Sequence, residues 1–282
     1  MITKILVTVT TYPTLSERYY ETVCTAGFRE DGSWIRIYPV PHRMLQNLLN
    51  ELPYHKWQWI EADLEKNPND SRPESFKIKN IETLKIGEML SKSRPTNWSL
   101  RYQWLTKNKK VYDNMEELIT LAYNNELSLA VLKPIEITNF IIEPKKDMEK
   151  HDKKLMELQK KYQVEKLQLS LFDEETRKRD FEFAKAIPYW FRYEFRTADN
   201  KVRRLMIEDW EIGMLYLNCL KREPENIALE KVKQKYMEFV RKYDLYLLVG
   251  TQFRYHMMKS PDPFVIIGVF TAPRNIQLRL DF

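Results

Sequence analysis

The sequence has few glycines and almost no cysteine, and these shortages exclude several common classes of protein. Its six glycines are scattered, and none lies in the G-x-x-x-x-G-K pattern of a phosphate-binding loop or the G-x-G-x-x-G pattern of a dinucleotide-binding turn. Two cysteines are too few for a disulfide framework, and no Cys-x-x-Cys pair is present to bind zinc. The chain is therefore not a helicase, a motor or a dehydrogenase of the usual kind.

Catalytic signatures and long hydrophobic runs are also missing. The four histidines lie far apart without H-x-x-x-H spacing, and no G-x-S-x-G elbow occurs. No stretch approaches the roughly 20 apolar residues that a membrane span needs. The apolar run near the N-terminus is broken by threonines and a proline, and it is too short for a signal peptide. We expect a cytoplasmic protein that does not contact membranes.

What the chain does have is a globular composition with a mild basic excess. Hydrophobic residues make up 43% and aromatic residues 13% of its 282 residues, enough for a sizeable core. The 46 basic residues outnumber the 40 acidic ones, so the net charge is +6. An excess of this size is compatible with nucleic-acid binding but does not require it.

The alternation of apolar residues predicts an α+β fold with a β-rich domain at residues 1–145. Asp31-Gly32 between two strand patterns is a strong signal for a hairpin. One helix is marked in this half, with Asp113 as its expected N-cap and Glu116 three residues later. The strands are expected at residues 4–12, 20–28, 33–40, 57–67, 76–86 and 127–144.

The composition changes after this domain. Residues 146–180 are expected to form a charged helical linker, because lysines and acids surround a narrow apolar stripe of Leu155, Leu158 and Tyr162. Residues 181–282 are expected to form a second, α+β domain. Its strands are predicted at 187–196, 202–207, 245–251 and 263–270 and its helices at about 208–221 and 225–241. An alternative is that strands of both halves share one sheet.

Two short stretches in this chain repeat nearly the same pattern. The linker contains Gln168-Leu169-Ser170-Leu171-Phe172, and the chain ends with Gln277-Leu278-Arg279-Leu280-Asp281-Phe282. These stretches resemble the five-residue and six-residue peptides by which bacterial proteins dock on the DNA sliding clamp. The resemblance covers 11 of the 282 residues and implies nothing about the rest of the fold.

The resemblance implies a role for each residue of the two motifs. Leu171 and Phe172 would fill the deep pocket of the clamp, Leu169 would pack at its rim, and Gln168 would supply the orienting hydrogen bonds. In the terminal motif Leu280 and Phe282 would enter the pocket and Gln277 would orient the peptide, with Leu278 beside it. A chain terminus and a charged linker are both places from which a docking peptide can reach a partner.

The same residues also allow a structural interpretation. Leu167, Leu169 and Leu171 alternate as they would in a strand that faces a core. Ile276, Leu278, Leu280 and Phe282 alternate in the same way. Under this alternative both motifs are core strands, and the protein is a nucleic-acid-binding module without any link to the clamp.

The strand at 57–67 suggests a metal site. If Ile60, Ala62 and Leu64 point into a core, then Trp57, Trp59, Glu61 and Asp63 line the other face. Two carboxylates two residues apart on a strand can hold Mg²⁺, with Lys66 nearby, and indoles can stack on bases. Glu61, Asp63 and Lys66 are thus the candidate catalytic residues of a metal-dependent nuclease, although the spacing differs from that of restriction-type nucleases. A plain strand that packs under a loop is the alternative.

Arginines interleave with aromatic residues in the second domain. If strands 187–196 and 202–207 pair, then Arg192, Arg196, Arg203 and Arg204 can share a sheet face and contact a phosphate backbone. The alternative is that these arginines are solvated or paired with Glu194. Asp209 and Glu211 near a helix start are interpreted as capping charges.

Together these patterns predict a DNA-associated protein that docks on the bacterial sliding clamp. It would act in DNA replication or repair, or in a phage-defence or mobile-element system. A Mg²⁺-dependent nuclease delivered by the clamp and a nucleic-acid-binding module without the clamp are the alternatives.

Overall fold

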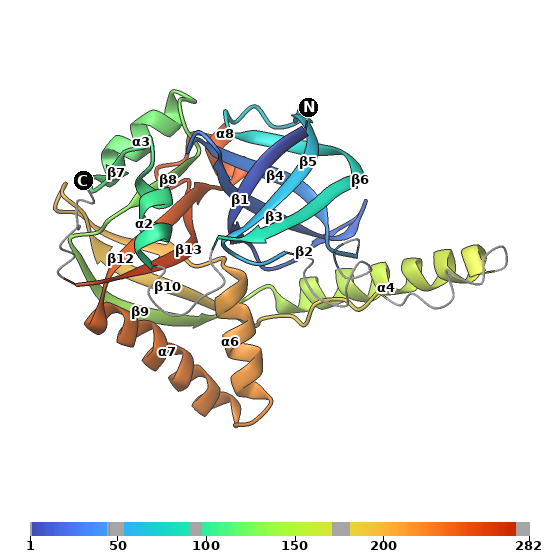
Figure 1. Ribbon diagram of the computed structural model, residues 1–282. Helices are drawn as coiled ribbons and strands as arrows, with labels where there is room; N and C mark the ends of the chain where they lie inside the picture. The colour runs from blue at the N-terminus through green and yellow to red at the C-terminus, as the bar shows by residue number, and fades with distance from the viewer. Residues whose placement is uncertain (1, 44, 46–53, 91–97, 171–180, 275–282) are drawn as a thin grey trace.

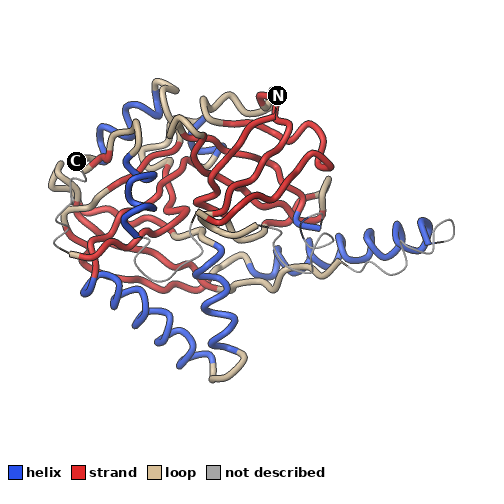
Figure 2. Tube along the Cα trace, viewed as in Figure 1, coloured by secondary structure: helices blue, strands red, loops and turns tan. Residues whose placement is uncertain are grey.

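The computed structural model describes residues 2–43, 45, 54–90, 98–170 and 181–274. It confirms the α+β class, with a β-rich N-terminal half followed by mixed strands and helices (Figures 1 and 2). Within these ranges no helix combines the length and the apolar character that crossing a membrane requires.

The N-terminal half is a small β-barrel. Its strands are β1 (Ile2–Thr10), β2 (Thr14–Ser16), β3 (Tyr20–Arg29), β4 (Trp34–Pro41), β5 (Gln58–Lys66) and β6 (Ser75–Met89). Because β1 pairs with both β3 and β5, the order β1-β3-β4-β6-β5 closes on itself, with β4 and β6 parallel. This is the strand order of the OB-fold barrel.

Sequence features explain how the barrel forms. Ile60, Ala62 and Leu64 of β5 point into its interior, as their alternation predicted. The predicted hairpin joins β3 to β4, and Gly32 takes the positive φ of 87° that its turn requires. At Gly27 strands β1 and β3 approach so closely that a Cβ atom would lie 2.1 Å from the carbonyl oxygen of Leu6.

The second half contains two further sheets. One has the order β13-β12-β8-β7 and the other the order β11-β10-β9. Their strands are β7 (Val111–Tyr112), β8 (Leu129–Leu132), β9 (Glu136–Pro144), β10 (Tyr189–Arg196), β11 (Val202–Met206), β12 (Tyr243–Thr251) and β13 (Phe264–Pro273). Strands from residues 111–144 therefore pair with strands that follow residue 189, and the boundary expected near residue 145 falls inside this mixed unit.

The helices cover these sheets, except for α4, which projects from the body (Figure 1). They are α2 (Trp98–Thr106), α3 (Met115–Tyr123), α4 (Met148–Ser170), α6 (Trp210–Leu220), α7 (Glu225–Lys242) and α8 (Phe253–Met257). The N-cap of α3 is Asn114 and not Asp113, because Asn114 has extended backbone and its side chain accepts from the N–H groups of Glu116 and Glu117. Asp209 caps α6 as predicted.

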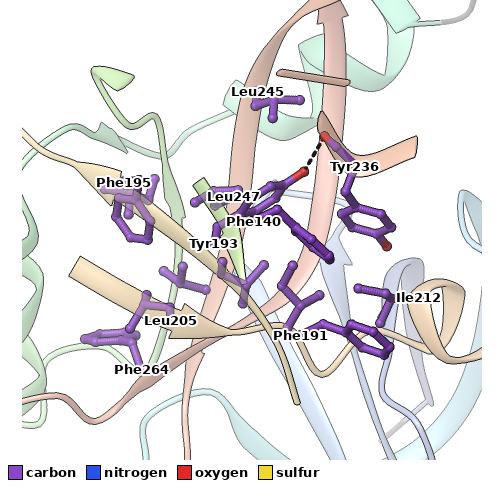
Figure 3. Packing of buried hydrophobic residues seen from close by; sticks show 14 of the residues in the cluster. Phe140, Phe191, Tyr193, Phe195, Leu205, Ile212, Tyr236, Leu245, Leu247 and Phe264 are labelled. Carbon is purple, nitrogen blue, oxygen red and sulfur yellow. Dashed lines mark hydrogen bonds between the residues drawn. The ribbon is translucent and has the colours of Figure 1, made fainter. Parts of the chain in front are cut away.

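The sheet that contains β12 is buried on both faces, because its side chains alternate between two cores. Leu245 and Leu247 join the core that also contains Phe140, Tyr193 and Tyr236 (Figure 3). In that core the Tyr193 hydroxyl donates a 2.9 Å hydrogen bond to the Tyr236 carbonyl oxygen.

The opposite face of this sheet packs against the outside of the barrel. Tyr246 and Leu248 of β12 meet Leu6, Ala26 and Phe28 of β1 and β3. Both halves of the molecule therefore share one continuous apolar junction, which explains why the strand patterns at 245–251 and 263–270 are almost uniformly apolar.

Buried charges flank this apolar junction. The Arg36 guanidinium of β4 is 3% exposed and donates to the Ser128 hydroxyl at 2.7 Å and to the Thr251 carbonyl oxygen. The Glu74 carboxylate accepts from the backbone N–H and the hydroxyl of Ser128. Burial and, to a smaller extent, the nearby charge of Arg72 lower the pKa of Arg36 to about 10. These contacts fix the barrel on the sheet.

Candidate functional site

The helix α4 forms an arm that leads away from the body. With 23 residues at 1.5 Å each, it is about 34 Å long. Near its middle Leu158 and Tyr162 pack against Tyr20, Phe181 and Phe183, so the chain that returns at residue 181 lies along the helix. The far end of the arm is Ser170, the most distant described part of α4 in Figure 1.

The arm bears on the two interpretations of the internal motif. Residues 148–170 form a helix, so the segment up to Ser170 is not the core strand of the alternative interpretation. Leu167, which that interpretation placed in a core, is 66% exposed. Gln168, Leu169 and Ser170 lie in the last turn of α4. Leu171 and Phe172 lie outside the described residues, as does the whole terminal motif from Gln277 to Phe282.

The strand face that suggested a metal site is only partly assembled. Trp57 precedes β5 with a positive φ of 65°, which breaks the alternation. Its side chain is 7% exposed and packs on Phe270, in the same apolar cluster that Trp59 packs against, so the Trp57 indole is buried in the junction and is not available to stack on a base.

Trp59, Glu61 and Lys66 each lie next to other residues of the protein. Trp59 packs against Trp104, with ring centres 5.1 Å apart. Glu61 lies between Lys4 of β1 and Lys85 of β6 in the sheet register. The Lys66 ammonium donates to the Pro73 carbonyl oxygen. Across the described ranges no three His, Cys, Asp or Glu side chains gather as metal ligands.

The arginines of the second half do not all share a face. Strand β10 pairs with β11 as predicted, and the register places Arg192, Arg196 and Arg204 on one side. Arg203 lies opposite Phe195 and so points to the other side, where it pairs with Glu116, Asp199 and Asp262.

On the shared side most of the charge is already neutralised. The guanidinium of Arg192 bonds Glu143 at 3.0 Å, and that of Arg204 bonds Glu194 at 2.7 Å. This is the pairing with Glu194 that the alternative interpretation expected. Exposed pairs of this kind are weak, yet they leave little free positive charge to attract phosphates.

The barrel also lacks the free surface that OB-folds use for oligonucleotides. In those barrels the second and third strands and the loops after the first and fourth strands contact the ligand. Here Ala26 and Phe28 of β3 pack on the β13-β12-β8-β7 sheet, called the central sheet below, and Arg36 of β4 is buried there. Arg72, in the loop between β5 and β6, donates to Thr251 of β12. The β1–β3 loop and Glu21, at the start of β3, still line an open space.

That space is a pocket of about 860 Å³ where the barrel, the base of α4 and the start of α6 meet. Thr11 to Leu15 of the β1–β3 loop form one wall, and residues 143–148 and 207–213 form others. Glu208 is held in place by both halves. Its N–H donates to the Ile266 carbonyl oxygen, its own carbonyl oxygen accepts from Tyr12, and its carboxylate accepts from the Gln252 amide at 2.7 Å.

The ionisable groups of the pocket are perturbed in opposite directions. Burial raises the pKa of the Glu208 carboxyl, and the positive charge of Lys145 opposes this. Burial lowers the pKa of Lys145, whose ammonium lies 4.2 Å from the ring centre of Trp190. Opposite shifts in one cavity are typical of functional sites.

Next to the pocket lies a second buried pair. Burial raises the pKa of Asp209 to about 6, although Lys56, 2.9 Å away, opposes the rise. Burial by itself would lower the pKa of Lys56, but Asp209 and Glu211 raise it overall. The Asp209 carboxylate also accepts from the Glu211 N–H, so this residue serves the start of α6 and its charge is matched.

Sequence reasoning did not identify Lys145 or Glu208. Lys145 was assigned to the edge of a charged linker and Glu208 to the start of a helix. The signal available was a charged residue directly after a strand in each case, at Pro144-Lys145 and Ile207-Glu208. That signal is common at strand ends, and only the tertiary structure brings these two residues to one cavity.

Two protein-family models match the chain. One, described as the domain of unknown function DUF8758, matches residues 1–107, and the other, described as the domain of unknown function DUF8757, matches residues 111–281. No curated protein matches. The interval between the two segments falls between α2 and β7, where the barrel half ends and the strands of the second half begin.

Proposed function

We propose that this chain, which belongs to the DUF8757 family through residues 111–281, docks on the bacterial replication sliding clamp with the motif Gln168–Phe172. The observation that carries the proposal is the arm. Helix α4 projects from the body and reaches its outer end at the residues where the motif begins.

The arm satisfies the physical requirements of a docking element. A peptide that must enter a pocket on another protein has to stand clear of its own core. Leu167, immediately before the motif, is largely exposed, while Leu158 and Tyr162 fix the middle of the helix to the body. A motif held at a distance by a rigid helix loses less conformational freedom on binding than one in a long flexible loop.

The size of the motif sets the affinity expected. Burying a leucine and a phenylalanine contributes about 1.5–3 kcal/mol each, and the glutamine adds hydrogen bonds, less the cost of ordering. Docking on the order of micromolar follows. If Gln277–Phe282 also docks, one molecule can occupy two pockets of a ring, and the effective concentration strengthens both contacts.

The DNA association in this proposal comes from the clamp. The arginines of the β9-β10-β11 face are largely paired, and the surface that OB-folds use for oligonucleotides is covered, so direct DNA contacts have little support. A clamp-docked protein is still delivered to DNA during replication, repair or defence against phages and mobile elements. The nuclease alternative would need Glu61 and Asp63, and no specific observation favours it.

The test is calorimetric titration of the full chain with a purified bacterial sliding clamp. We expect micromolar binding that falls at least about tenfold in the double variant Leu171→Ala/Phe172→Ala, with an unchanged melting temperature. The matched control is Leu167→Ala, an exposed leucine of the same arm outside the motif. A variant that lacks residues 277–282 tests the terminal motif separately.

Two results would contradict the proposal. One is the absence of binding by the wild-type chain at clamp concentrations of tens of micromolar. The other is binding that the double variant does not reduce, because the clamp would then contact the terminal motif, if the deletion reduces binding, or another surface, if it does not. A synthetic peptide of residues 164–175 should compete with the full chain for the clamp.

A further inference from the structure

The pocket at the base of the arm has the size and setting of a ligand site, and it is independent of clamp docking. Its volume of about 860 Å³ lies within the range of pockets that hold small molecules. It lies between the two halves of the molecule, where binding sites are common. Residues from the β1–β3 loop, the base of α4 and the start of α6 converge on it.

The charged side chains of this pocket fall into two groups. In the first group the charges are matched within the protein. Asp209 pairs with Lys56, Glu21 with His42 at 2.8 Å, and Glu143 with Arg192. These pairs need nothing from a ligand.

The second group has charges without an ion pair at salt-bridge distance, although Lys145 and Glu208 interact with each other electrostatically over a longer range. Among the residues that the structure describes, no carboxylate lies within salt-bridge distance of Lys145, Lys146 or Lys185, and no cation lies within that distance of Glu208. The pocket therefore presents three positive charges and one negative charge that a ligand can match. Lys146 and Lys185 are exposed, whereas Lys145 and Glu208 are partly buried, and a buried charge without a direct ion pair is costly, so a protein keeps one where it has a use.

Between these charges the pocket has an apolar lining. Ile187, Phe191, Ile207 and Ile212 contribute to it, and all four also belong to the core. The lining is thus fixed in position and offers a rigid surface to a flat ring. The ligand that fits has a flat ring, a hydrogen-bond donor edge for the carboxylate and an anionic group for the lysines.

We propose that this pocket binds a nucleotide, with the phosphate held by Lys145, Lys146 and Lys185 and the donor edge of the base held by Glu208. A carboxylate accepts hydrogen bonds from base N–H groups. Guanine presents two such donors side by side, so a guanine nucleotide is the preferred ligand. The ring lies against the isoleucines and Phe191. The nucleotide is either free or the terminal residue of a strand, since both offer the same groups.

The test is isothermal titration of the full chain with five probes: dGMP, dAMP, dCMP, inorganic phosphate and a tetranucleotide that ends in dG. We expect dGMP to bind most tightly among the mononucleotides. Glu208→Gln should weaken dGMP about tenfold and leave phosphate unchanged, because the base contact alone is lost. Lys145→Met should weaken all probes. Tighter binding of the tetranucleotide than of dGMP identifies a strand end as the source, and the reverse identifies the free nucleotide.

Each control variant makes the same substitution as a pocket variant, but at an exposed position. Glu82→Gln and Lys233→Met change exposed side chains far from the pocket in the sequence and should bind every probe like the wild type. Melting temperatures establish that each variant is folded. The proposal is overturned if no nucleotide binds, if binding survives both pocket variants, or if Glu208→Gln weakens phosphate as much as dGMP. Clamp titration of the same variants should be unaffected, so this proposal and the docking proposal fail separately.

Discussion

The barrel meets the second half of the molecule at the apolar junction and at the pocket. These two places differ in whether their charged side chains have partners within the protein. At the apolar junction the Arg36 guanidinium donates to the Ser128 hydroxyl and the Thr251 carbonyl oxygen, and Leu6 and Phe28 pack on β12. At the pocket Lys145 and Glu208 line open space and interact with each other electrostatically without forming a salt bridge. The first place holds the halves together, and the second leaves interactions for a ligand. Charges that are fully matched are structural, and unmatched ones indicate a binding role.

The largest expected effect comes from removing the buried, fully hydrogen-bonded charge of Arg36. Arg36→Met leaves the Glu74 carboxylate without its buried cationic neighbour and removes donors to Ser128 and Thr251. We expect the free energy of unfolding to fall by about 3–5 kcal/mol, measured by urea denaturation. The control Arg222→Met, on the surface after α6, should change it by less than about 0.5 kcal/mol. A loss below about 1 kcal/mol for Arg36→Met would mean that the network contributes little.

A somewhat smaller effect is expected from the apolar part of the same junction. Leu248→Ala should cost about 3 kcal/mol, because Leu248 is buried between the central sheet and the barrel and its loss leaves a cavity. Leu167→Ala on the arm removes the same atoms from an exposed position and should change stability by less than about 0.5 kcal/mol. Equal losses in thermal denaturation would show that the arm is packed as tightly as the junction.

The smallest effect, and one of opposite sign, is expected at the pocket. Because the folded protein raises the pKa of Glu208, the protonated form is favoured by folding. The resulting stabilisation is complete below the unfolded pKa of about 4.5 and is lost as the pH rises through the higher folded pKa. Glu208→Gln keeps an oxygen that can accept from Gln252 but carries no charge.

This variant should therefore be more stable than the wild type at pH 8, by on the order of 1 kcal/mol, and equal to it at pH 4. Urea midpoints at the two pH values measure the difference, with Glu82→Gln as the control. A variant that is less stable at pH 8 would show that the Glu208 charge is matched after all. The comparison between the two places would then lose its basis.

Local features of the fold were predictable because they depend on neighbours in the sequence. The hairpin at Gly32, the inward face of β5 and the helix of the arm all follow from turn chemistry or from alternation. The closure of the barrel was not predictable, because it requires β1 to pair with both β3 and β5. Alternating strands match any partner equally well, so the pattern does not specify which strands meet.

The residues of the two proposed sites also differ in whether they are neighbours in the sequence. The motif Gln168–Phe172 is continuous in the sequence and could be recognised there. Trp57 was predicted as part of an accessible face but is buried against Phe270, a contact between distant segments that alternation along one strand cannot reveal. Lys145 and Glu208 lie 63 positions apart and acquire a shared role only when β9 and the start of α6 come together.

Because the central sheet is buried on both faces, the two segments that the family models match, residues 1–107 and 111–281, depend on each other. Cut between residues 107 and 111, the chain would yield one fragment with a bare barrel wall and another with a bare sheet face. Each fragment alone would expose the apolar surface that the other normally covers, and would aggregate. Produced together, they should reassemble from their shared surface alone. The junction thus makes this chain suited to fragment complementation, with the cut chosen where α2 gives way to β7.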